Sequence, residues 1–273
     1  MTNSQFRIEE LSDKQWRILF DNPPSNIVTP ETVLEFQALV DKIEASQTLQ
    51  VVVFESANPD YFFGRYDLAR ASDTPITPGP TGLPTWIDMT VRLSQLPVVS
   101  IAKIRGRTRG GGAELAEAMD MRFASLEKAI FGQPEVGAGI VPGGGALDRL
   151  PPLLGRARAL EVILGSLDYD AATAELYGWV NRALPDAELD AYVDLIACRI
   201  ATFDKPALAA AKDFVNRHTL PDPKDLLAVQ DLFLGPAATW PTVPGRRAKI
   251  YAKVGAVGPA EFERNMGKYL GEV

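Results

Sequence analysis

The sequence predicts an α/β fold that gives way to an all-helical segment toward the C-terminus. Short apolar segments rich in β-branched residues, such as Val51–Phe54 and Val98–Ile104, alternate with longer amphipathic segments. That alternation is typical of buried strands and covering helices. From Asp186 onward the hydrophobic spacing is almost entirely helical. We therefore expect a core over residues 1–200 and a C-terminal helical subdomain over residues 201–273.

The composition is that of an ordinary globular protein. Hydrophobic residues make up 46% of the 273 residues and charged residues 23%, close to the averages for globular domains. No apolar run approaches membrane-spanning length, and Met1–Gln5 lacks the basic start and apolar core of a signal peptide. Cys198 is the only cysteine, so no internal disulfide can form and a reducing compartment is expected. Together these features predict a cytoplasmic location and no membrane anchor.

Charge and residue usage argue against several classes of function. The net charge is −7, from 28 basic and 35 acidic residues, whereas a nucleic-acid-binding protein usually carries a basic surplus or a basic face. The single histidine, His218, ends a polar segment remote from the glycine-rich motif described below, which disfavours a catalytic triad. No cluster of His and Cys predicts a metal site, and no Walker sequence is present.

The predicted elements of the N-terminal part follow from periodicity and helix-start signals. Thr29-Pro30-Glu31 combines an N-cap residue, a first-turn proline and an acidic first turn, so a helix covering the sheet is expected to begin there. Residues 72–84 are rich in Pro, Gly and Thr and predict an irregular connection, either a lid over a pocket or an inert loop. The other expected elements are strands at residues 6–8, 16–20, 51–54 and 98–104 and a helix at residues 85–96.

The part of the chain after the glycine-rich motif is predicted to be mostly helical. Ala146–Leu164 predicts a short helix, a break at Pro151-Pro152 and a second helix. Asp168–Val180 predicts a capped helix, a glycine stop at Gly178 and a short strand. Further helices are expected near residues 205–217, 223–234 and 259–270.

A glycine run supplies the strongest chemical signal. Gly110-Gly111-Gly112 leads into the helix formers Ala113–Met119, so a ligand can approach a bare main chain at a helix start whose N–H groups are unpaired. Such donors suit a developing negative oxygen. Glu114 follows the run and Glu135 follows a second turn, so two carboxylates could converge on one substrate. The alternative is that Glu114 and Glu117 only complement the helix dipole and that Glu135 is a solvated turn residue.

The ordered combination of motifs resembles the crotonase superfamily, also called the enoyl-CoA hydratase/isomerase family. The matching segments are Gly110–Ala116 (GGGAELA), Asp120, Phe131–Glu135 (FGQPE) and Gly139–Gly145 (GIVPGGG), and a weaker likeness extends from about residue 16 to about residue 215. The resemblance implies a crotonase-like spiral of repeated ββα units, followed by C-terminal helices that build a homotrimer or hexamer. It also implies an acyl-CoA thioester substrate and no separate cofactor, since coenzyme A is part of that substrate.

The resemblance assigns roles to individual residues. Phe62–Leu68 aligns with the family's oxyanion loop, so the N–H groups of Tyr66 and Gly111 would form the oxyanion hole, and Glu114 and Glu135 would be catalytic. Substrate contacts would fall on Gly64, Asp67, Leu68, Gly110, Pro134 and Gly143. The residue types also favour Asp67 as the cap of a helix that begins near Leu68.

Several features depart from the family pattern. Arg65 stands where a glycine is usual, and the bulky Tyr66 either packs on apolar neighbours or hydrogen-bonds a polar acyl group. The stretch Gly235–Gly258 departs from the usual tail, which leaves the adenine contacts unassigned. Three alternating arginines could contact CoA phosphates, a carboxylated acyl group or acidic partners in structural ion pairs; they are Arg105, Arg107 and Arg109.

Two carboxylates and two backbone donors predict an enzyme. The expected reaction is the addition of water to a 2-enoyl-CoA, in which Glu114 activates the water and Glu135 exchanges the proton at the α-carbon. The two N–H groups would stabilise the enolate. One alternative is a double-bond isomerase, in which one glutamate shuttles a proton. Another is a catalytically silent acyl-CoA-binding protein that kept the fold.

Overall fold

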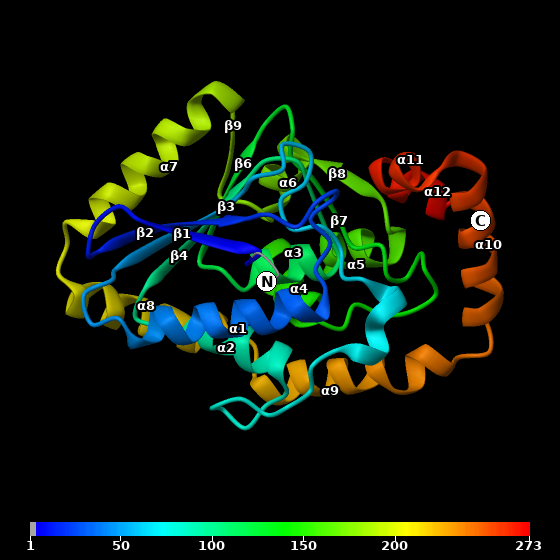
Figure 1. The fold of residues 1–273 in the computed structure, drawn as a ribbon, viewed down its shortest axis with the longest axis horizontal. Coiled ribbons are helices and arrows are strands. Elements are labelled where there is room, and N and C mark those ends of the chain that lie inside the picture. Colours follow the sequence, from blue (N-terminus) through cyan, green and yellow to red (C-terminus); the bar gives the residue numbers. More distant parts are fainter. Residues whose placement is uncertain (1–3) are drawn as a thin grey trace.

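The computed structural model describes residues 4–273 and contains two β-sheets (Figure 1). The larger, six-stranded sheet has the order β1-β2-β3-β4-β6-β9; only the β1–β2 pair is antiparallel. Its strands are β1 (Phe6–Glu10), β2 (Gln15–Phe20), β3 (Val51–Ser56), β4 (Val99–Ile104), β6 (Met121–Ser125) and β9 (Arg182–Leu184). The smaller, three-stranded sheet pairs β5 (Arg107–Arg109), β7 (Ile130–Gly132) and β8 (Asp168–Asp170) in that order.

The chain repeats a strand–strand–helix unit that links the two sheets. In one repeat β4 joins the large sheet, β5 joins the small sheet, and α3 (Gly111–Glu117) follows. In the next repeat β6, β7 and α4 (Ala146–Leu154) do the same. After β3, Tyr61 makes a single parallel bridge to Arg107 at the edge of the small sheet. The predicted α/β fold with repeated ββα units is therefore confirmed.

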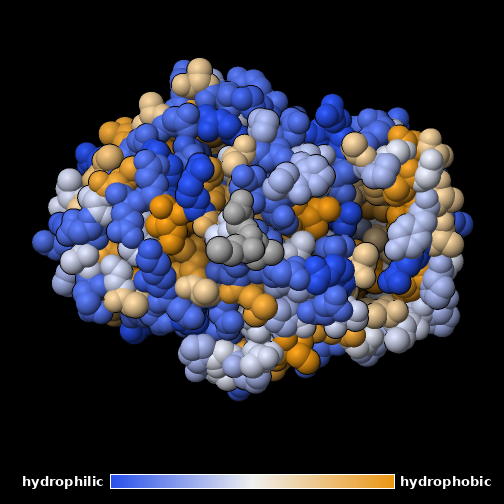
Figure 2. Space-filling model, viewed as in Figure 1, coloured by the Kyte–Doolittle hydropathy of each residue, from blue (hydrophilic) through white to orange (hydrophobic). Residues whose placement is uncertain are grey.

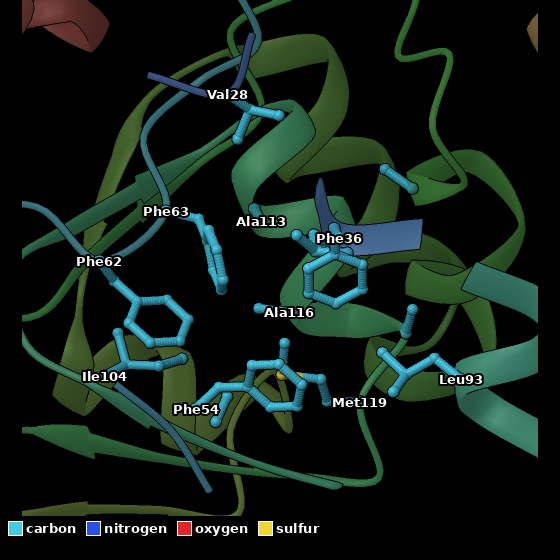
Figure 3. Close-up of a cluster of buried hydrophobic side chains, with 14 of the residues drawn as sticks. Val28, Phe36, Phe54, Phe62, Phe63, Leu93, Ile104, Ala113, Ala116 and Met119 are labelled. Carbon is cyan, nitrogen blue, oxygen red and sulfur yellow. The ribbon is translucent and has the colours of Figure 1, made fainter. Parts of the chain in front are cut away.

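One face of the large sheet is covered by α1 (Pro30–Ala45) and α2 (Thr85–Gln95) (Figure 1). The predicted start of α1 is confirmed, because Thr29 is its N-cap and accepts a hydrogen bond from the N–H of Thr32. Beneath these helices lies an aromatic cluster, and Figure 3 shows the small side chains of α3 turned toward it. Its central members are Phe36, Phe54, Phe62 and Phe63, and the α3 side chains are those of Ala113 and Ala116. Small residues let α3 pack close to the rings.

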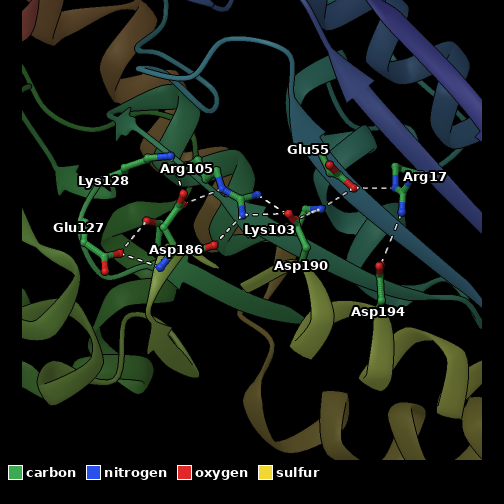
Figure 4. Close-up of polar contacts among 10 residues, drawn as sticks. Arg17, Glu55, Lys103, Arg105, Glu127, Lys128, Asp186, Asp190 and Asp194 are labelled. Carbon is green, nitrogen blue, oxygen red and sulfur yellow. Dashed lines mark hydrogen bonds and ion pairs between the residues drawn. The ribbon is translucent and has the colours of Figure 1, made fainter. Parts of the chain in front are cut away.

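The opposite face of the sheet is covered by α7 (Asp186–Ala201) (Figure 1). Side chains alternate along β3, so Val52 and Phe54 enter the aromatic core whereas Val51 and Val53 pack with Leu189 of α7. Charged groups also bind α7 to the sheet (Figure 4). Lys103 Nζ lies 2.9 Å from Glu55 Oε1 and 2.6 Å from Asp190 Oδ1.

The three alternating arginines have structural partners. Arg105 Nε lies 2.7 Å from Asp186 Oδ1, at the start of α7. Arg109 is 2% exposed and makes two hydrogen bonds to the carboxylate of Asp168, of 2.7 and 2.9 Å. Arg107 donates to the carbonyl oxygen of Arg264 at 2.9 Å. The ion-pair interpretation is thus confirmed for Arg105 and Arg109.

Most of the remaining predicted helices are present. They are α5 (Arg156–Gly165), α6 (Ala171–Tyr177), α8 (Lys205–Thr219), α9 (Pro223–Leu234), α11 (Pro259–Arg264), α12 (Met266–Leu270) and the 3-10 turn η1 (Leu68–Asp73). A second 3-10 turn, η2 (Pro236–Thr239), was not expected. The capped helix predicted within Asp168–Val180 is present: Asp170 is the cap of α6, and Gly178 ends it with a φ of 86°, whereas the strand β8 at Asp168–Asp170 was not expected. The helix expected near residues 259–270 is divided into α11 and α12 at Asn265, whose φ is −121°.

Two helix predictions need correction. The proline pair Pro151-Pro152 lies inside α4, and the break comes instead at Gly155, whose φ of 80° ends the helix. The helix α10 (Val243–Val257) was not expected. Its proline, Pro244, lies in the first helical turn, where a missing N–H breaks no helical hydrogen bond.

The remaining expectations about the whole chain concern termini and location. The absence of a signal peptide was predicted partly from Met1–Asn3, which lie outside the described residues. Within residues 4–273 no helix is both long and apolar enough to cross a membrane. The division of the chain at residue 200 stays a prediction. In the view of Figure 2 the surface is hollowed beside the C-terminal helices, and apolar side chains gather around that hollow.

Candidate active site

A small cavity lies at the N-terminal end of α3. Its volume is about 40 Å³, and five parts of the chain form its wall. Tyr66, Leu68 and Thr74 come from the loop after β3; Gly111 and Glu114 from α3; Glu135, Gly143 and Gly144 from the loop after β7; and Gln230, Phe233 and Leu234 from α9, with Trp86 of α2 beside them. Both predicted catalytic glutamates thus line one cavity.

The start of α3 brings the main chain close to both glutamate loops. Gly110 has a φ of 48°, and a Cβ atom at this position would lie 2.2 Å from Glu135 Oε1. Only glycine fits, because any side chain would be strained by the backbone and would displace the carboxyl group. A Cβ atom on Gly111 would lie 2.9 Å from Tyr66 Cβ and 3.4 Å from Tyr66 N. The backbones of Tyr66 and Gly111 are therefore neighbours, as the predicted oxyanion hole requires.

Glu114 is held by backbone donors. Its side chain is buried, and Oε1 accepts hydrogen bonds from the N–H groups of Gly144 at 2.8 Å and Ala146 at 3.1 Å. Burial raises the pKa of Glu114, while these two hydrogen bonds favour the ionised form and oppose the rise. Glu114 is therefore fixed in place, and its ionised form is better stabilised than that of Glu135.

Glu135 has a more apolar environment. Its side chain is buried, and Oε2 is enclosed without a hydrogen-bond partner among residues 4–273. Burial, and then the negative charge of Glu114, raise the pKa of Glu135 well above its usual value. Two carboxyl groups that share one enclosed space tend to retain a proton between them. This arrangement favours Glu135 as the protonated member of the pair.

Glu117, which the sequence suggests only as a complement to the helix dipole, is a third buried carboxyl group. Glu117 accepts hydrogen bonds from Trp179 Nε1 at 3.0 Å and Gln133 Nε2 at 3.3 Å. Burial raises its pKa to about 8, and the charge of Glu114 adds to the rise. Glu117 lies outside the cavity wall. Its spacing of three residues from Glu114 was the available signal, since such residues share a helix face.

The predicted substrate-binding residues fall into three groups, of which only the first lines the cavity. Leu68 and Gly143 line the cavity, and Gly110 and Pro134 lie against Glu135 and against each other. Gly64 is part of the oxyanion loop and packs against a neighbouring segment, where a Cβ atom would lie 2.6 Å from the carbonyl oxygen of Ser25. Asp67 is the cap of η1: its Oδ1 accepts from the N–H of Ala69 at 3.2 Å. Gly64 and Asp67 therefore shape the loop and are not part of the cavity wall.

The two departures in the oxyanion loop also have structural partners. Tyr66 packs edge-on against Trp86, with ring centroids 6.0 Å apart, and its hydroxyl lies 2.8 Å from Thr74 Oγ1. Arg65 turns away from the cavity, and its Nε lies 3.0 Å from Glu263 Oε2 in α11. The side chain that replaces the usual glycine thus ties the oxyanion loop to the C-terminal helices.

Other candidate sites among the described residues lack this chemistry. A second hollow of about 340 Å³ is lined by Ala238, Val243, Pro244, Arg247, Ala248 and Tyr251, and it contains no carboxylate. His218 is exposed on α8. Within residues 4–273 no group of three or more His, Cys, Asp or Glu side chains is arranged to hold a metal ion. The cavity at α3 is therefore the candidate active site.

The fold and the site define an α/β protein in which two buried carboxyl groups share a cavity with two neighbouring backbone segments at a helix start. A profile of the enoyl-CoA hydratase/isomerase family matches residues 14–234. The chain belongs to this family, and so to the crotonase superfamily that its motifs indicated.

Comparison with known proteins supports this placement. A crystal structure from Streptomyces avermitilis, named as a candidate enoyl-CoA hydratase, aligns with a TM-score of 0.90 and 40% identity over 100% of this chain and 99% of that one. The short-chain-enoyl-CoA hydratase of Clostridium acetobutylicum is 30% identical over 210 residues, which are 77% of this chain and 80% of that protein. The crotonase-like fold is thus confirmed, including the helical C-terminal segment.

Other curated relatives match over a shorter range. A Rhizobium meliloti protein, also named as a candidate enoyl-CoA hydratase, is 44% identical over 118 residues, which are 43% of this chain and 45% of the relative. The chain spans about half the length of the first curated relatives it matches, with 47% and 45% of the two covered. The activity of the chain is therefore a matter for proposal.

Proposed function

We propose that the protein is a 2-enoyl-CoA hydratase, which adds water across the conjugated double bond of an acyl-CoA thioester. The observation that carries this proposal is the shared cavity of Glu114 and Glu135, two buried carboxyl groups with different hydrogen-bond environments. Hydration needs one group that accepts a proton from water and one that gives a proton to carbon. The better-stabilised Glu114 suits the first role, and the protonated Glu135 suits the second.

The proposed reaction follows from these roles. Glu114 removes a proton from water, the resulting hydroxide oxygen bonds to the β-carbon, and Glu135 gives its proton to the α-carbon. One water is added, and the pair of glutamates ends with the same number of protons. Negative charge passes through the thioester oxygen, where the N–H groups of Tyr66 and Gly111 would stabilise it. Loss of one such donor typically costs about 3 kcal/mol of barrier.

The two alternative functions make different demands on the same site. In an isomerase one glutamate would move a proton along the acyl chain without consuming water, and Glu135 with its unpaired Oε2 could do so alone. A silent acyl-CoA-binding protein would need neither carboxyl group. The presence of both in one cavity favours hydration over each alternative.

The test is loss of the absorbance of the conjugated thioester when purified protein meets short, medium and aromatic 2-enoyl-CoAs. We expect turnover by the wild type and its near-complete loss in both Glu114→Gln and Glu135→Gln. Glu175→Gln, on the exposed face of α6, is the matched control and should keep full activity. Thioester binding without turnover in the wild type would contradict hydration and favour a silent binder. Turnover that survives Glu114→Gln and moves the double bond would favour the isomerase.

We propose further that the protein is a cytoplasmic homotrimer or hexamer without a separate cofactor. Large apolar side chains are exposed on or beside α5, α6 and α8, and they support an oligomeric interface; they include Leu164, Leu167, Leu176, Phe214 and Val215. Hydration is redox-neutral, so the proposed reaction needs no redox cofactor. Coenzyme A would enter only as part of the substrate. Light scattering of the purified protein would give the oligomeric state.

A further inference from the structure

Gln230 is a buried amide in the wall of the candidate active site. Its side chain comes from α9, is 3% exposed, and shares the cavity with Glu114 and Glu135. Its Oε1 atom is enclosed and accepts no hydrogen bond from any residue between 4 and 273. Burying an amide without a partner opposes folding. Because this amide lies in the wall of the cavity, it is a candidate for binding a ligand.

Packing alone would favour an apolar residue at position 230. Leu226, Gln230 and Phe233 share one face of α9, because they are spaced four and three residues apart. That face packs on the loop Gly143–Gly145: Cβ atoms on Gly143 and Gly145 would lie 2.4 Å from Phe233 Cγ and 3.3 Å from Leu226 Cδ2. Gln230 is thus a polar interruption of an apolar face, set against the loop that holds Glu114.

The hydroxyl and indole groups of the cavity wall already have hydrogen-bond partners. The hydroxyl of Tyr66 bonds to Thr74, and Trp86 Nε1 donates to the carbonyl oxygen of Gly144 at 3.0 Å. Among the described residues that line the cavity, the enclosed polar side-chain atoms without a partner are Glu135 Oε2 and Gln230 Oε1. The proposed reaction gives Glu135 a role in proton transfer. Gln230 has no role in that reaction, so its free amide oxygen could bind a group on the substrate.

We propose that Gln230 determines specificity by hydrogen-bonding a hydroxyl group on the acyl chain, so that the substrate class is a hydroxylated 2-enoyl-CoA. This inference rests on the proposed hydratase function. A hydroxyl can donate to Oε1 and accept from Nε2, so it matches both ends of the amide. A carboxylate on the acyl chain would be repelled by the glutamate pair in the same enclosed space. A plain alkyl chain would leave the amide unpaired.

The test compares 2-butenoyl-CoA with 4-hydroxy-2-butenoyl-CoA, and 2-pentenoyl-CoA with 5-hydroxy-2-pentenoyl-CoA, in the wild type and in Gln230→Leu. We expect the wild type to prefer at least one hydroxylated substrate by about 10-fold in kcat/KM, the effect of one hydrogen bond between neutral groups. In Gln230→Leu the preference should fall to about 1-fold, mainly through a higher KM for the hydroxylated substrate. The measured quantity is the ratio of kcat/KM for the hydroxylated and the plain substrate, which divides out any effect of the substitution on hydration itself.

Gln50→Leu is the matched control. Gln50 is also buried with an unpartnered Oε1, but it lies outside the cavity, where its Nε2 donates to the carbonyl oxygen of Phe203 at 2.8 Å. This variant should lose thermal stability and keep the substrate preference. A wild type without preference, a preference that survives Gln230→Leu, or an equal loss on both substrates with a lower Tm would each overturn the inference while leaving hydration intact. Turnover of no enoyl-CoA at all would overturn both proposals.

Discussion

The cavity at α3 and the interface between the large sheet and α7 both contain acidic side chains, but the pKa values of these side chains are shifted in opposite directions. In the cavity Glu135 faces Glu114, and burial raises the pKa of both carboxyl groups, although the charge of the nearby Arg149 opposes the rise at Glu114. At the interface Asp190 accepts hydrogen bonds from Arg105 and Lys103 (Figure 4). These bonds lower the pKa of Asp190 to about 2, whereas burial raises that of Glu135. Pairing favours the ionised carboxylate at the interface, whereas burial and the neighbouring negative charge favour the protonated form of Glu135 in the cavity.

The largest expected effect is the loss of activity without loss of stability in the cavity. Glu135→Gln removes a transferable proton but keeps the shape of the side chain, so kcat should fall by about 10²–10⁴-fold. The free energy of unfolding should stay the same or rise, because a neutral amide replaces a buried titratable group. Steady-state kinetics and thermal unfolding of the same preparation measure both. A parallel fall in Tm would mean that Glu135 serves the fold rather than the reaction.

The converse is expected at the interface. Lys103 is 5% exposed and pairs with Glu55 and Asp190, so Lys103→Met should cost about 2 kcal/mol of stability and lower the Tm by roughly 4–8 °C. The activity of the folded fraction should be unchanged. Lys42→Met is the control, because its partner Glu10 and Lys42 itself are both more than half exposed, and such pairs contribute little. Equal effects of the two variants would refute the distinction.

Glu117 provides an intermediate test with a defined pH dependence. Its folded pKa of about 8 lies above the unfolded value of about 4.3. The folded state therefore loses stability as the pH rises between these values, and the loss is complete above about pH 8. Glu117→Gln should raise the Tm by about 3 °C or more at pH 9 and by less at pH 5. A Tm difference that is independent of pH would show that Glu117 is already ionised in the folded protein.

The smallest effect is expected for Asp190→Asn. The side chain of Asp190 is 58% exposed, so solvent screens its ion pairs and the cost at pH 7 should be about 0.5 kcal/mol. Its folded pKa of about 2 lies below the unfolded value of about 3.9, so this contribution is present above pH 4 and is lost as the pH falls toward 2. Thermal unfolding at pH 6 and pH 3 should show the difference between wild type and variant shrinking. A constant difference would contradict the assigned pKa.

Local patterns predicted most of the fold. The β-branched run of β3 and the N-cap of α1 each depend on a few neighbouring residues, and both were located from sequence. The helix α10 was missed because Gly and Pro lower local helix propensity throughout Gly235–Gly258, whereas the position of Pro244 in the first turn makes it harmless.

The candidate site was predictable only where its residues belong to ordered motifs. Glu114 and Glu135 follow their glycine and proline turns closely, so their convergence could be inferred. The partner of Arg65, Glu263, and the cavity position of Gln230 depend on how the C-terminal helices fold back on the core. No local pattern encodes such contacts, because they join residues far apart in the chain.

The cavity wall is divided between two stretches of sequence that could vary independently. The carboxyl groups and the main-chain donors come from residues before 200, whereas Gln230, Phe233 and Leu234 come from a helix after it. If Gln230 binds the acyl group as proposed, the carboxyl groups and this part of the acyl preference lie in separate stretches of the sequence. A chimaera that joins residues 1–200 of this chain to the matching C-terminal segment of a relative would keep the chemistry and exchange the acyl preference.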